Sequence, residues 1–341
     1  MSAMSQRVPQ NRLTRRVFAA AAASLALPAR LSAQSPHEKV TFATNWLPQG
    51  EHGGFYQALA DGTFARAGLD VTIRPGGPQV NNRALLAAER IEFFMGGNFM
   101  QAFSAAAEGI PTLAVAAIFE KDPQALISHP GQGFERFEDL KNASQLFLSK
   151  PGQASFFPWL KTAHGFREES IRPYAFNAAP FLADKRSVQQ AYATSEPYAI
   201  AKLTGLRPNV FLLADHGFDT PSTLIETRRA LVEQNPDLVK RFVEASIAGW
   251  IQYLDGDRAE ADRLILSGNA DMAQDRIDFA HAAMLKLGIV SGSAGARETL
   301  GVIDAERAKR FFETLVRSGL MKPETDFSKA FSTRFAIKRQ S

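Results

Sequence analysis

The sequence predicts an α/β protein of two lobes with a ligand cleft between them and a helical C-terminal region. Three observations lead to this fold class. Apolar strands alternate with helices from Lys39 to Phe119, the alternation restarts at Phe137, and helical periodicity dominates after about residue 222. Strands that alternate with helices are typical of parallel sheets whose faces are covered by helices. Open sheets of this kind bind ligands at the carboxyl ends of their strands.

Each expected element follows from its local pattern. Alternating apolar residues predict a strand at 39–44, and Asn235 followed by Pro236 predicts the start of a helix. Further strands are expected at 68–73, 91–95, 112–119, 145–149, 172–176, 191–194 and 210–214. Helices are expected at 52–64, 82–88, 99–107, 137–141, 156–164, 180–190, 259–267, 274–287 and 304–318, with a loop at 151–155.

The N-terminus has the three parts of a cleaved secretory signal. A basic head of Arg residues precedes the apolar run Val17–Leu27, and small residues end at a cleavage point after Ala33. The apolar run is about eleven residues, shorter than the roughly twenty that span a bilayer. Thr14–Phe18 is similar to a twin-arginine signal, with ordinary secretory export as the alternative. We therefore expect residues 1–33 to be removed on export to the periplasm.

Composition excludes several classes of function. Loss of residues 1–33 removes five Arg and no acidic residue, so the net charge of +4 becomes −1. The mature chain therefore lacks the basic surplus that nucleic-acid binding requires. No cysteine is present, which excludes disulfides, thiolate metal sites and a lipid-bearing N-terminal cysteine. A chain of roughly 300 residues can still bury an adequate core.

Polar and aromatic residues follow the first expected strand. Trp46 is suited to stacking on a planar ligand, and Asn45 offers both a donor and an acceptor. His52 stands at a helix start, where the helix dipole would lower its basicity. In the alternative interpretation, Trp46 packs in the core and His52 is a solvated cap.

Two further loops carry candidate ligand groups. Asn98 follows Gly96 and Gly97, which allow close backbone approach to a ligand, although Asn98 is equally suited to capping the next helix. Gln153 and Ser155 precede a helix whose free N–H groups would bind an anion or a carbonyl. Ser155 is equally suited to being only an N-cap.

Glu196 is the most specific single candidate for a ligand-binding residue. It follows an apolar strand and precedes Pro197, where a carboxylate would be partly enclosed and would bind an amine or an aminopyrimidine edge. Tyr192 and Tyr198 flank it. A surface Glu in a turn is the alternative, and Glu196 argues against an anionic ligand unless an arginine lies in the cleft.

Enzyme signatures are absent from the sequence. There is no Gly-x-Ser-x-Gly elbow, no His-Glu-x-x-His pair and no phosphate-binding glycine loop, and the six His show no ligand spacing. We therefore expect a non-enzymatic protein without cofactor or metal.

The motifs resemble those of a known family. Asn45–Tyr56, Ala60–Val71, Thr194–Pro197 and Glu233–Val243 are similar to segments of the SsuA/THI5-like (NMT1) binding proteins for thiamine-pyrimidine precursors, sulfonates, nitrate, taurine and riboflavin. The resemblance extends from 39 to about 320. It implies a type II periplasmic-binding-protein fold, with 38–127 plus 222–341 in lobe 1 and 128–221 in lobe 2. The family's ligand residues correspond to Trp46, His52 and Glu196, whereas the position of Asn98 often carries Asp.

The resemblance implies a function and partners. We expect a periplasmic substrate-binding component of an ABC importer, acting as a monomer with a small-molecule ligand and a membrane permease. The expected ligand is a planar nitrogenous compound similar to a thiamine pyrimidine precursor. A sulfonate, taurine or riboflavin binding protein, a periplasmic enzyme acting on a pyrimidine, and a partner of a sensor kinase are the alternatives.

Overall fold

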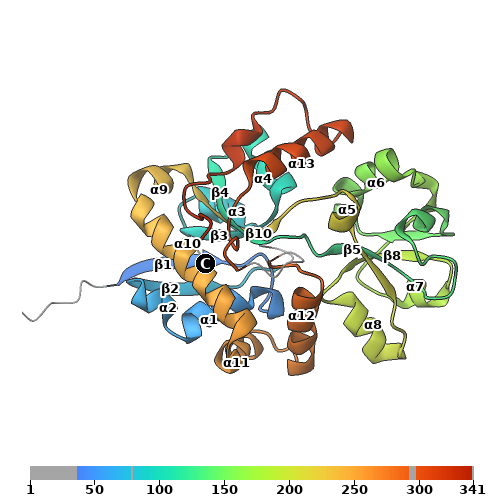
Figure 1. The fold of residues 1–341 in the computed structure, drawn as a ribbon, viewed down its shortest axis with the longest axis horizontal. Helices are drawn as coiled ribbons and strands as arrows, with labels where there is room; N and C mark the ends of the chain where they lie inside the picture. The colour runs from blue at the N-terminus through green and yellow to red at the C-terminus, as the bar shows by residue number, and fades with distance from the viewer. Residues whose placement is uncertain (1–36, 78–79, 292–296, 340–341) are drawn as a thin grey trace, which may run out of the picture. The chain divides into compact units, whose positions relative to one another are not determined.

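The strands form two five-stranded sheets (Figure 1). The computed structural model describes residues 37–77, 80–291 and 297–339, so the expected signal segment 1–33 lies outside the described residues. Sheet A has the order β2-β1-β3-β10-β4 and sheet B the order β7-β6-β8-β5-β9. The strands are β1 (Glu38–Ala43), β2 (Leu69–Arg74), β3 (Phe93–Asn98), β4 (Thr112–Phe119), β5 (Gln124–Ser128), β6 (Leu146–Leu148), β7 (Ile171–Pro173), β8 (Val188–Tyr192), β9 (Asn209–Leu212) and β10 (Ser222–Arg228).

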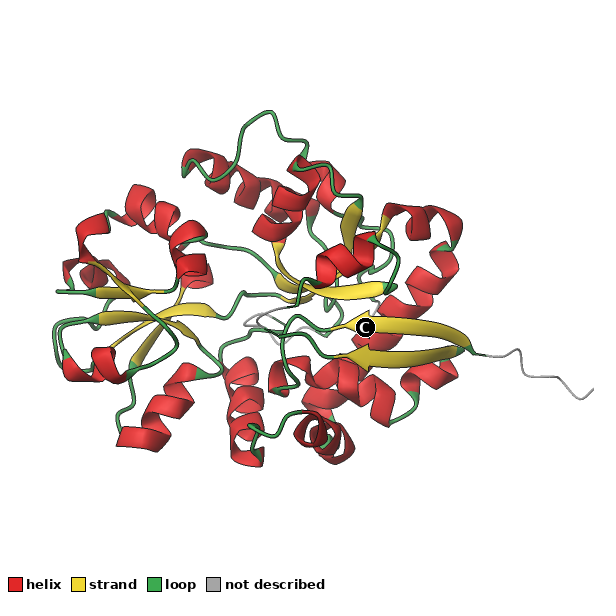
Figure 2. Cartoon of the chain, turned by 180° about the vertical axis from the view of Figure 1, so that it is seen from behind, coloured by secondary structure: helices red, strands yellow, loops and turns green. Residues whose placement is uncertain are grey.

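Helices cover both faces of each sheet (Figure 2). The α-helices are α1 (Gly53–Ala60), α2 (Thr63–Arg66), α3 (Asn82–Ala87), α4 (Phe99–Ala107), α5 (Lys150–Ala154), α6 (Phe157–His164), α7 (Ala179–Ala183), α8 (Glu196–Thr204), α9 (Arg229–Gln234), α10 (Pro236–Asp255), α11 (Ala259–Gly268), α12 (Gln274–Lys286) and α13 (Ala305–Arg317). Short 3-10 helices are η1 (Gly50–His52), η2 (Phe137–Asn142), η3 (Glu168–Ser170), η4 (Leu213–His216) and η5 (Phe327–Ala330). Over the described residues, no helix combines the length and the apolar character needed to span a bilayer.

The two sheets share one pattern of strand directions. In sheet A, β1 is parallel to β2 and β3, while β10 lies antiparallel between β3 and β4. In sheet B, β6 is parallel to β7 and β8, and β5 is antiparallel to β8 and β9. The chain passes from β4 to β5 and returns from β9 to β10, so sheet B is built from a segment inserted between two neighbouring strands of sheet A. The predicted α/β class is confirmed.

The sequence pattern missed the antiparallel strands β5 and β10. β10 carries Ser, Thr, Glu, Thr and Arg among its seven residues, yet all but Arg228 are buried because the strand lies inside sheet A. Such a composition does not alternate between apolar and polar residues, so its period gives no strand signal. The expected helix at 180–190 was also wrong in extent: α7 ends at Ala183, and a turn leads into β8. The expected loop at 151–155 is mostly the short helix α5.

Close contact between α1 and α10 holds the core of the sheet A half. A Cβ atom on Gly53 would lie 2.1 Å from the Tyr253 ring, and one on Gly54 would lie 2.1 Å from Cγ of Trp250. Both aromatic side chains are fully buried, and Phe55 and Phe119 pack edge-on against Trp250. The Gly-Gly pair of the N-terminal motif therefore serves helix packing, and it fixes the start of α1 next to η1.

We predict that Gly54→Ala destabilises the protein. Alanine is normally better than glycine inside a helix by about 1 kcal/mol. Here the added methyl group would overlap the Trp250 ring, and overpacking of a core costs about 1–3 kcal/mol. Urea unfolding should show the lower stability. Gly77→Ala is the control, because a Cβ atom there has no neighbour within 4 Å. Equal stability of both variants would contradict this account of the packing.

Candidate functional site

The halves built on the two sheets meet in a cluster of polar side chains next to the first chain crossing, where the Ala193 N–H donates to the Pro123 carbonyl at 2.9 Å. The Thr194 hydroxyl donates to Glu51 Oε1 at 2.5 Å, and Arg276 Nη2 donates to Ser195 Oγ at 3.0 Å. Glu196 follows directly. We call Glu51, Thr194, Ser195, Glu196 and Arg276 the junction cluster. Glu51 and Arg276 belong to η1 and α12 of the sheet A half, and the other three lie between β8 and the first turn of α8.

Glu51 is a buried carboxyl group that was not among the site residues predicted from the sequence. Its residue is only 4% exposed. Burial raises its pKa above the usual 4.5, although the hydrogen bond from Thr194 and the charge of Arg276 both act in the opposite direction. The group therefore keeps a proton to higher pH than an exposed glutamate. In the protonated form it can donate a hydrogen bond as well as accept one.

Glu196 is held by local contacts at the start of α8. Its Oε2 accepts the backbone N–H of Tyr192 at 2.8 Å, and its Oε1 accepts the Tyr174 hydroxyl at 3.4 Å. Burial raises its pKa, while these hydrogen bonds and Arg276 lower it. The carboxylate is thus partly enclosed and is not a freely solvated turn residue.

Tyr192 lies among acidic groups from both halves. Burial raises the pKa of its hydroxyl well above 10, and the charges of Asp122, Glu51 and Glu196 add to the effect. The phenol therefore stays protonated and is available as a donor. Its neighbour Tyr198 instead packs its ring against Phe279 of α12, with ring centroids 5.3 Å apart.

Arg276 supplies the cation whose charge acts on both Glu51 and Glu196. It comes from the first turn of α12, eighty residues after Glu196 in the chain. No motif marked it in the sequence, and only its position opposite β8 and α8 reveals it. Its neighbour Asp275 forms an ion pair with Lys202 of α8 at 2.6 Å, which adds a second contact between α12 and α8.

Asn98 is occupied by protein contacts. Its Oδ1 accepts the backbone N–H of Met100 at 3.1 Å, which confirms the helix-cap interpretation. Its Nδ2 donates to Oδ2 of Asp122 at 2.6 Å. Asp122 is buried, and this burial raises its pKa. An amide at position 98 fits this partner, because an aspartate there would place two carboxylates in contact.

Gly96 makes room for a protein side chain. A Cβ atom on Gly96 would lie 1.9 Å from Oε1 of Glu226. Glu226 is fully buried in the middle of β10 and forms an ion pair with Arg83 at 2.5 Å. The space left by the missing side chain of Gly96 is therefore filled by Glu226 of sheet A and not by a ligand.

Trp46 and Asn45 lie on the loop after β1. The Trp46 ring is 42% exposed, so the alternative of a core tryptophan is wrong. Its backbone carbonyl accepts the Thr44 hydroxyl at 2.8 Å and the Gly76 N–H at 3.1 Å. The loop is thus fixed at its backbone while the Trp46 and Asn45 side chains remain exposed.

His52 is fully buried, which excludes the solvated cap. Neither ring nitrogen has a hydrogen-bond partner among the described residues. Burial lowers its pKa to about 3, so the ring is neutral at ordinary pH. The physical cause is desolvation by burial. The unpaired nitrogens leave His52 able to bind a polar group.

Gln153 and Ser155 make local bonds around α5. Gln153 Nε2 donates to the Leu148 carbonyl at 3.1 Å, and the Ser155 hydroxyl donates to the Pro151 carbonyl at 2.7 Å. Ser155 ends α5 and is not an N-cap; Ser149 caps that helix instead by accepting the Gly152 N–H at 3.1 Å. Among the described residues, neither side chain forms a hydrogen bond with the junction cluster.

The described residues contain no group of three His, Asp or Glu side chains that could hold a metal ion. The junction cluster instead combines carboxyl groups of raised pKa, hydroxyl groups and one guanidinium. Such a set can bind a polar organic molecule through donors and acceptors at once.

We predict that Glu51→Gln reduces the loss of stability at rising pH. The folded-state pKa of Glu51 lies above the unfolded value of 4.5, so its contribution is fully present below that pH and is lost as the pH rises through the folded pKa. Each unit of the shift corresponds to about 1.4 kcal/mol. Urea unfolding between pH 4.5 and 8 should show a flatter profile than the wild type. The exposed Glu313→Gln on α13 is the control, and identical profiles for all three proteins would refute the prediction.

Comparisons with known proteins give a relative that is similar in sequence and solved structures that are similar in fold. The riboflavin-binding protein RibY of Chloroflexus aurantiacus is 26% identical over 324 residues, which are 92% of this chain and 90% of the relative. The periplasmic aliphatic sulphonate binding protein SsuA of Escherichia coli has a similar fold, with a TM-score of 0.60 and 14% identity over 89% of this chain and 95% of that protein. The desulfurization enzyme DSZB is also similar, with a TM-score of 0.56 and 14% identity over 88% and 97%.

The structural likeness shows the fold alone, because these identities are low and the similar proteins include both a binding protein and an enzyme. The family model described as "NMT1/THI5 like" matches residues 49–259, which include η1, β8 and the start of α8. Arg276 lies outside that range. The chain has the periplasmic-binding-protein fold and belongs to the NMT1/THI5-like family.

Proposed function

We propose that this protein is the exported substrate-binding component of an ABC importer and that it binds a small planar nitrogen heterocycle at the junction cluster. The observation that carries the proposal is the meeting of Glu51 and Arg276 from one half with Glu196 from the other. A ligand held there contacts both halves, so its binding energy favours the closed arrangement. The closed form then docks on a membrane permease.

The chemistry of the cluster fits a heterocycle edge. Ring N–H or amino groups donate to the carboxyl groups of Glu196 and Glu51, and ring carbonyl or imine atoms accept from Arg276 or Tyr192. The exposed Trp46 ring offers an apolar face for stacking. RibY, whose name records riboflavin binding, supports a planar heterocycle of this kind. An aminopyrimidine similar to a thiamine precursor presents a related edge.

A sulfonate is the second candidate, and Arg276 favours it. From the sequence, an anionic ligand was expected only if an arginine lay near Glu196. The charge of Arg276 does act on Glu196. However, Arg276 already donates to Ser195 and faces two carboxyl groups, so a bound anion would have to overcome their repulsion. We therefore rank the sulfonate below the heterocycle.

The proposal includes two lobes, with 38–123 and 222–341 in one and 124–221 in the other. The boundary expected at 127 moves to about 123 because β5 (Gln124–Ser128) lies in sheet B. Export by the N-terminal signal, a periplasmic location, a monomeric state and the absence of catalysis belong to the same proposal. DSZB carries the name of an enzyme on a similar fold, so turnover needs its own measurement.

Native mass spectrometry of protein purified without refolding tests the proposed function. A bound mass equal to that of a flavin or an aminopyrimidine would support it and name the ligand. A bound sulfonate would retain the transporter and replace the ligand class. If the protein is isolated empty, titration with riboflavin, an aminopyrimidine and taurine decides the question. Failure of all three, or turnover of any of them, would overturn the proposal.

We predict opposite responses from Glu196→Gln and Arg276→Gln. Glu196→Gln removes a charge-assisted acceptor, so heterocycle affinity should fall by about tenfold or more, equivalent to about 1.4 kcal/mol. Sulfonate binding, if present, should instead increase in Glu196→Gln and disappear in Arg276→Gln. Isothermal titration calorimetry of both variants with both ligand classes measures this. If both variants bind the heterocycle as tightly as the wild type does, the ligand binds elsewhere.

We predict that Trp46→Ala weakens ligand binding without lowering stability. The ring is 42% exposed, so its removal leaves little buried cavity, whereas stacking of aromatic rings contributes about 0.5–1.5 kcal/mol. The expected loss of affinity is about three- to tenfold. Ile337→Ala is the matched control, because Ile337 is an apolar residue with 71% exposure on the C-terminal tail. Unchanged affinity in Trp46→Ala would remove Trp46 from the site.

A further inference from the structure

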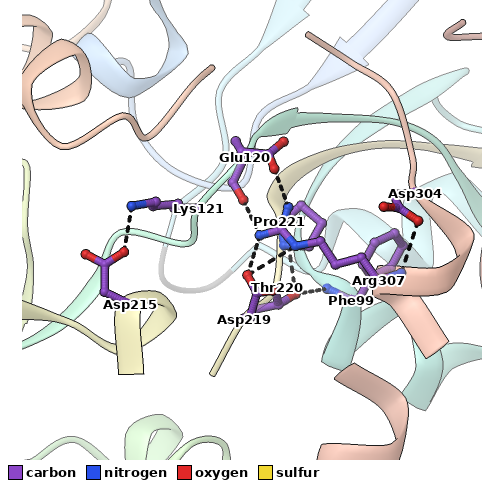
Figure 3. Close-up of polar contacts among 9 residues, drawn as sticks. All are labelled: Phe99, Glu120, Lys121, Asp215, Asp219, Thr220, Pro221, Asp304 and Arg307. Atoms are coloured by element: carbon purple, nitrogen blue, oxygen red, sulfur yellow. Dashed lines mark hydrogen bonds and ion pairs between the residues drawn. The ribbon is translucent and has the colours of Figure 1, made fainter. Parts of the chain in front are cut away.

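The two chain crossings between the sheets are joined to each other. We call residues 120–123 the first crossing and residues 217–221 the second crossing. The backbone N–H of Asp122 donates to the Thr220 carbonyl at 3.1 Å, which couples the crossings near their middle. Figure 3 shows the side chains that gather around them.

Arg307 of α13 binds both crossings with one guanidinium group (Figure 3). Its Nη1 donates to Oε1 of Glu120 at 2.7 Å, and its Nη2 donates to the Glu120 carbonyl at 2.7 Å. Nε and Nη2 also donate to Oδ1 of Asp219, at 3.1 and 2.5 Å. The Arg307 side chain is only 12% exposed. A planar guanidinium that makes several charge-assisted bonds fixes its partners in direction as well as in distance.

The backbone of Arg307 is held in place at the start of α13, and further hydrogen bonds tie the crossings to the sheet A half. Asp304 caps α13 and accepts the backbone N–H of Arg307 at 3.1 Å. The backbone N–H of Phe99, at the start of α4, lies 3.4 Å from the Thr220 hydroxyl oxygen. The backbone N–H of Lys121 donates to the Ile289 carbonyl at 3.0 Å. All these partners belong to the sheet A half, so residues 120–122 and 219–221 are fastened to that half.

Toward sheet B the crossings carry an apolar contact and an ion pair. Buried Phe218 of the second crossing packs on Trp159 of α6, with ring centroids 5.2 Å apart. Lys121 Nζ donates to Oδ1 of Asp215 at 2.6 Å, and the Asp215 side chain is 46% exposed. Exposed pairs contribute about 0–1 kcal/mol. Gly217 has a φ of +107°, a backbone conformation that favours glycine. Pro123 begins the sheet B side of the first crossing, where its carbonyl accepts the Ala193 N–H at 2.9 Å.

We propose that Arg307 is the positioning residue of a hinge whose pivots lie at Asp122–Pro123 and at Gly217. The inference rests on the proposed function, in which the halves close on a ligand. On closure, residues 120–122 and 219–221 move with the sheet A half, and the bend occurs beyond them. Arg307 also offsets the negative charges of Glu120 and Asp219, which would otherwise repel each other across the crossings.

Distance measurements by electron spin resonance test the hinge. The chain has no native cysteine, so Ala65→Cys on α2 and Ala183→Cys on α7 provide two exposed labelling sites, one in each half. Arg307→Met should broaden and shift the distance distribution of the ligand-free protein. Arg310→Met, an exposed arginine on the same helix, should leave the distribution unchanged. Ligand dissociation from Arg307→Met should become about tenfold faster.

Other variants separate a hinge role from a structural one. Arg307→Lys keeps the charge without the planar fork and should give an intermediate distribution. If Arg307→Met does not fold, Glu120→Gln combined with Asp219→Asn removes the same ion pairs and should broaden the distribution. A lower melting temperature with an unchanged distribution would overturn the inference. The label distances need no ligand, so failure of the wild type to bind any ligand would contradict the proposed function and not the hinge.

Discussion

The bonded pair of chain crossings is the constraint on which the rest of the structure depends. Sheet B is built from a segment that leaves sheet A after β4 and returns as β10, the direct neighbour of β4. Because β4 and β10 are antiparallel, the end of β4 and the start of β10 lie side by side, and a hydrogen bond from the Asp122 N–H to the Thr220 carbonyl joins the two crossings there. The two halves are connected only there along the chain, which is why the proposed hinge lies at the crossings. The junction cluster lies next to the first crossing, where η1 and α12 of one half meet the end of β8 and the start of α8 of the other.

Desolvation dominates the electrostatics of that meeting point. Burial is the largest influence on the pKa of Glu51, Asp122 and Glu196, and in each it raises the value against the hydrogen bonds that lower it. Such carboxyl groups are costly to leave charged and without a partner. Arg276 and the hydroxyl groups of Thr194 and Tyr174 reduce this cost for Glu51 and Glu196. The amide of Asn98 does so for Asp122. A ligand that supplies N–H groups would reduce it further, which links recognition to the closing of the halves.

Family membership narrows the function without deciding the ligand. Folds of this class serve both binding proteins and an enzyme, so the chemistry must be argued from individual side chains. Several family-like positions here have a role inside the protein: Gly53 and Gly54 admit the rings of α10, and Asn98 bonds to Asp122. The residues that remain open to a ligand are fewer than the motif suggests. Asn45 and Trp46 have exposed side chains, and both ring nitrogens of His52 lack a partner among the described residues. In the junction cluster, Glu196 and Arg276 are partly exposed.

Local periodicity in the sequence determined the α/β class, most strands and helices, and the positions of Trp46 and Glu196 just after strands, because these depend on neighbouring residues. Burial and pairing are decided between residues far apart in the chain, and only the tertiary structure supplied them. It made β10 an internal strand in spite of its polar residues, and it enclosed His52. It also brought Arg276 beside Glu196 across eighty residues, since packing of α12 against α8 leaves no trace in the local pattern of either helix.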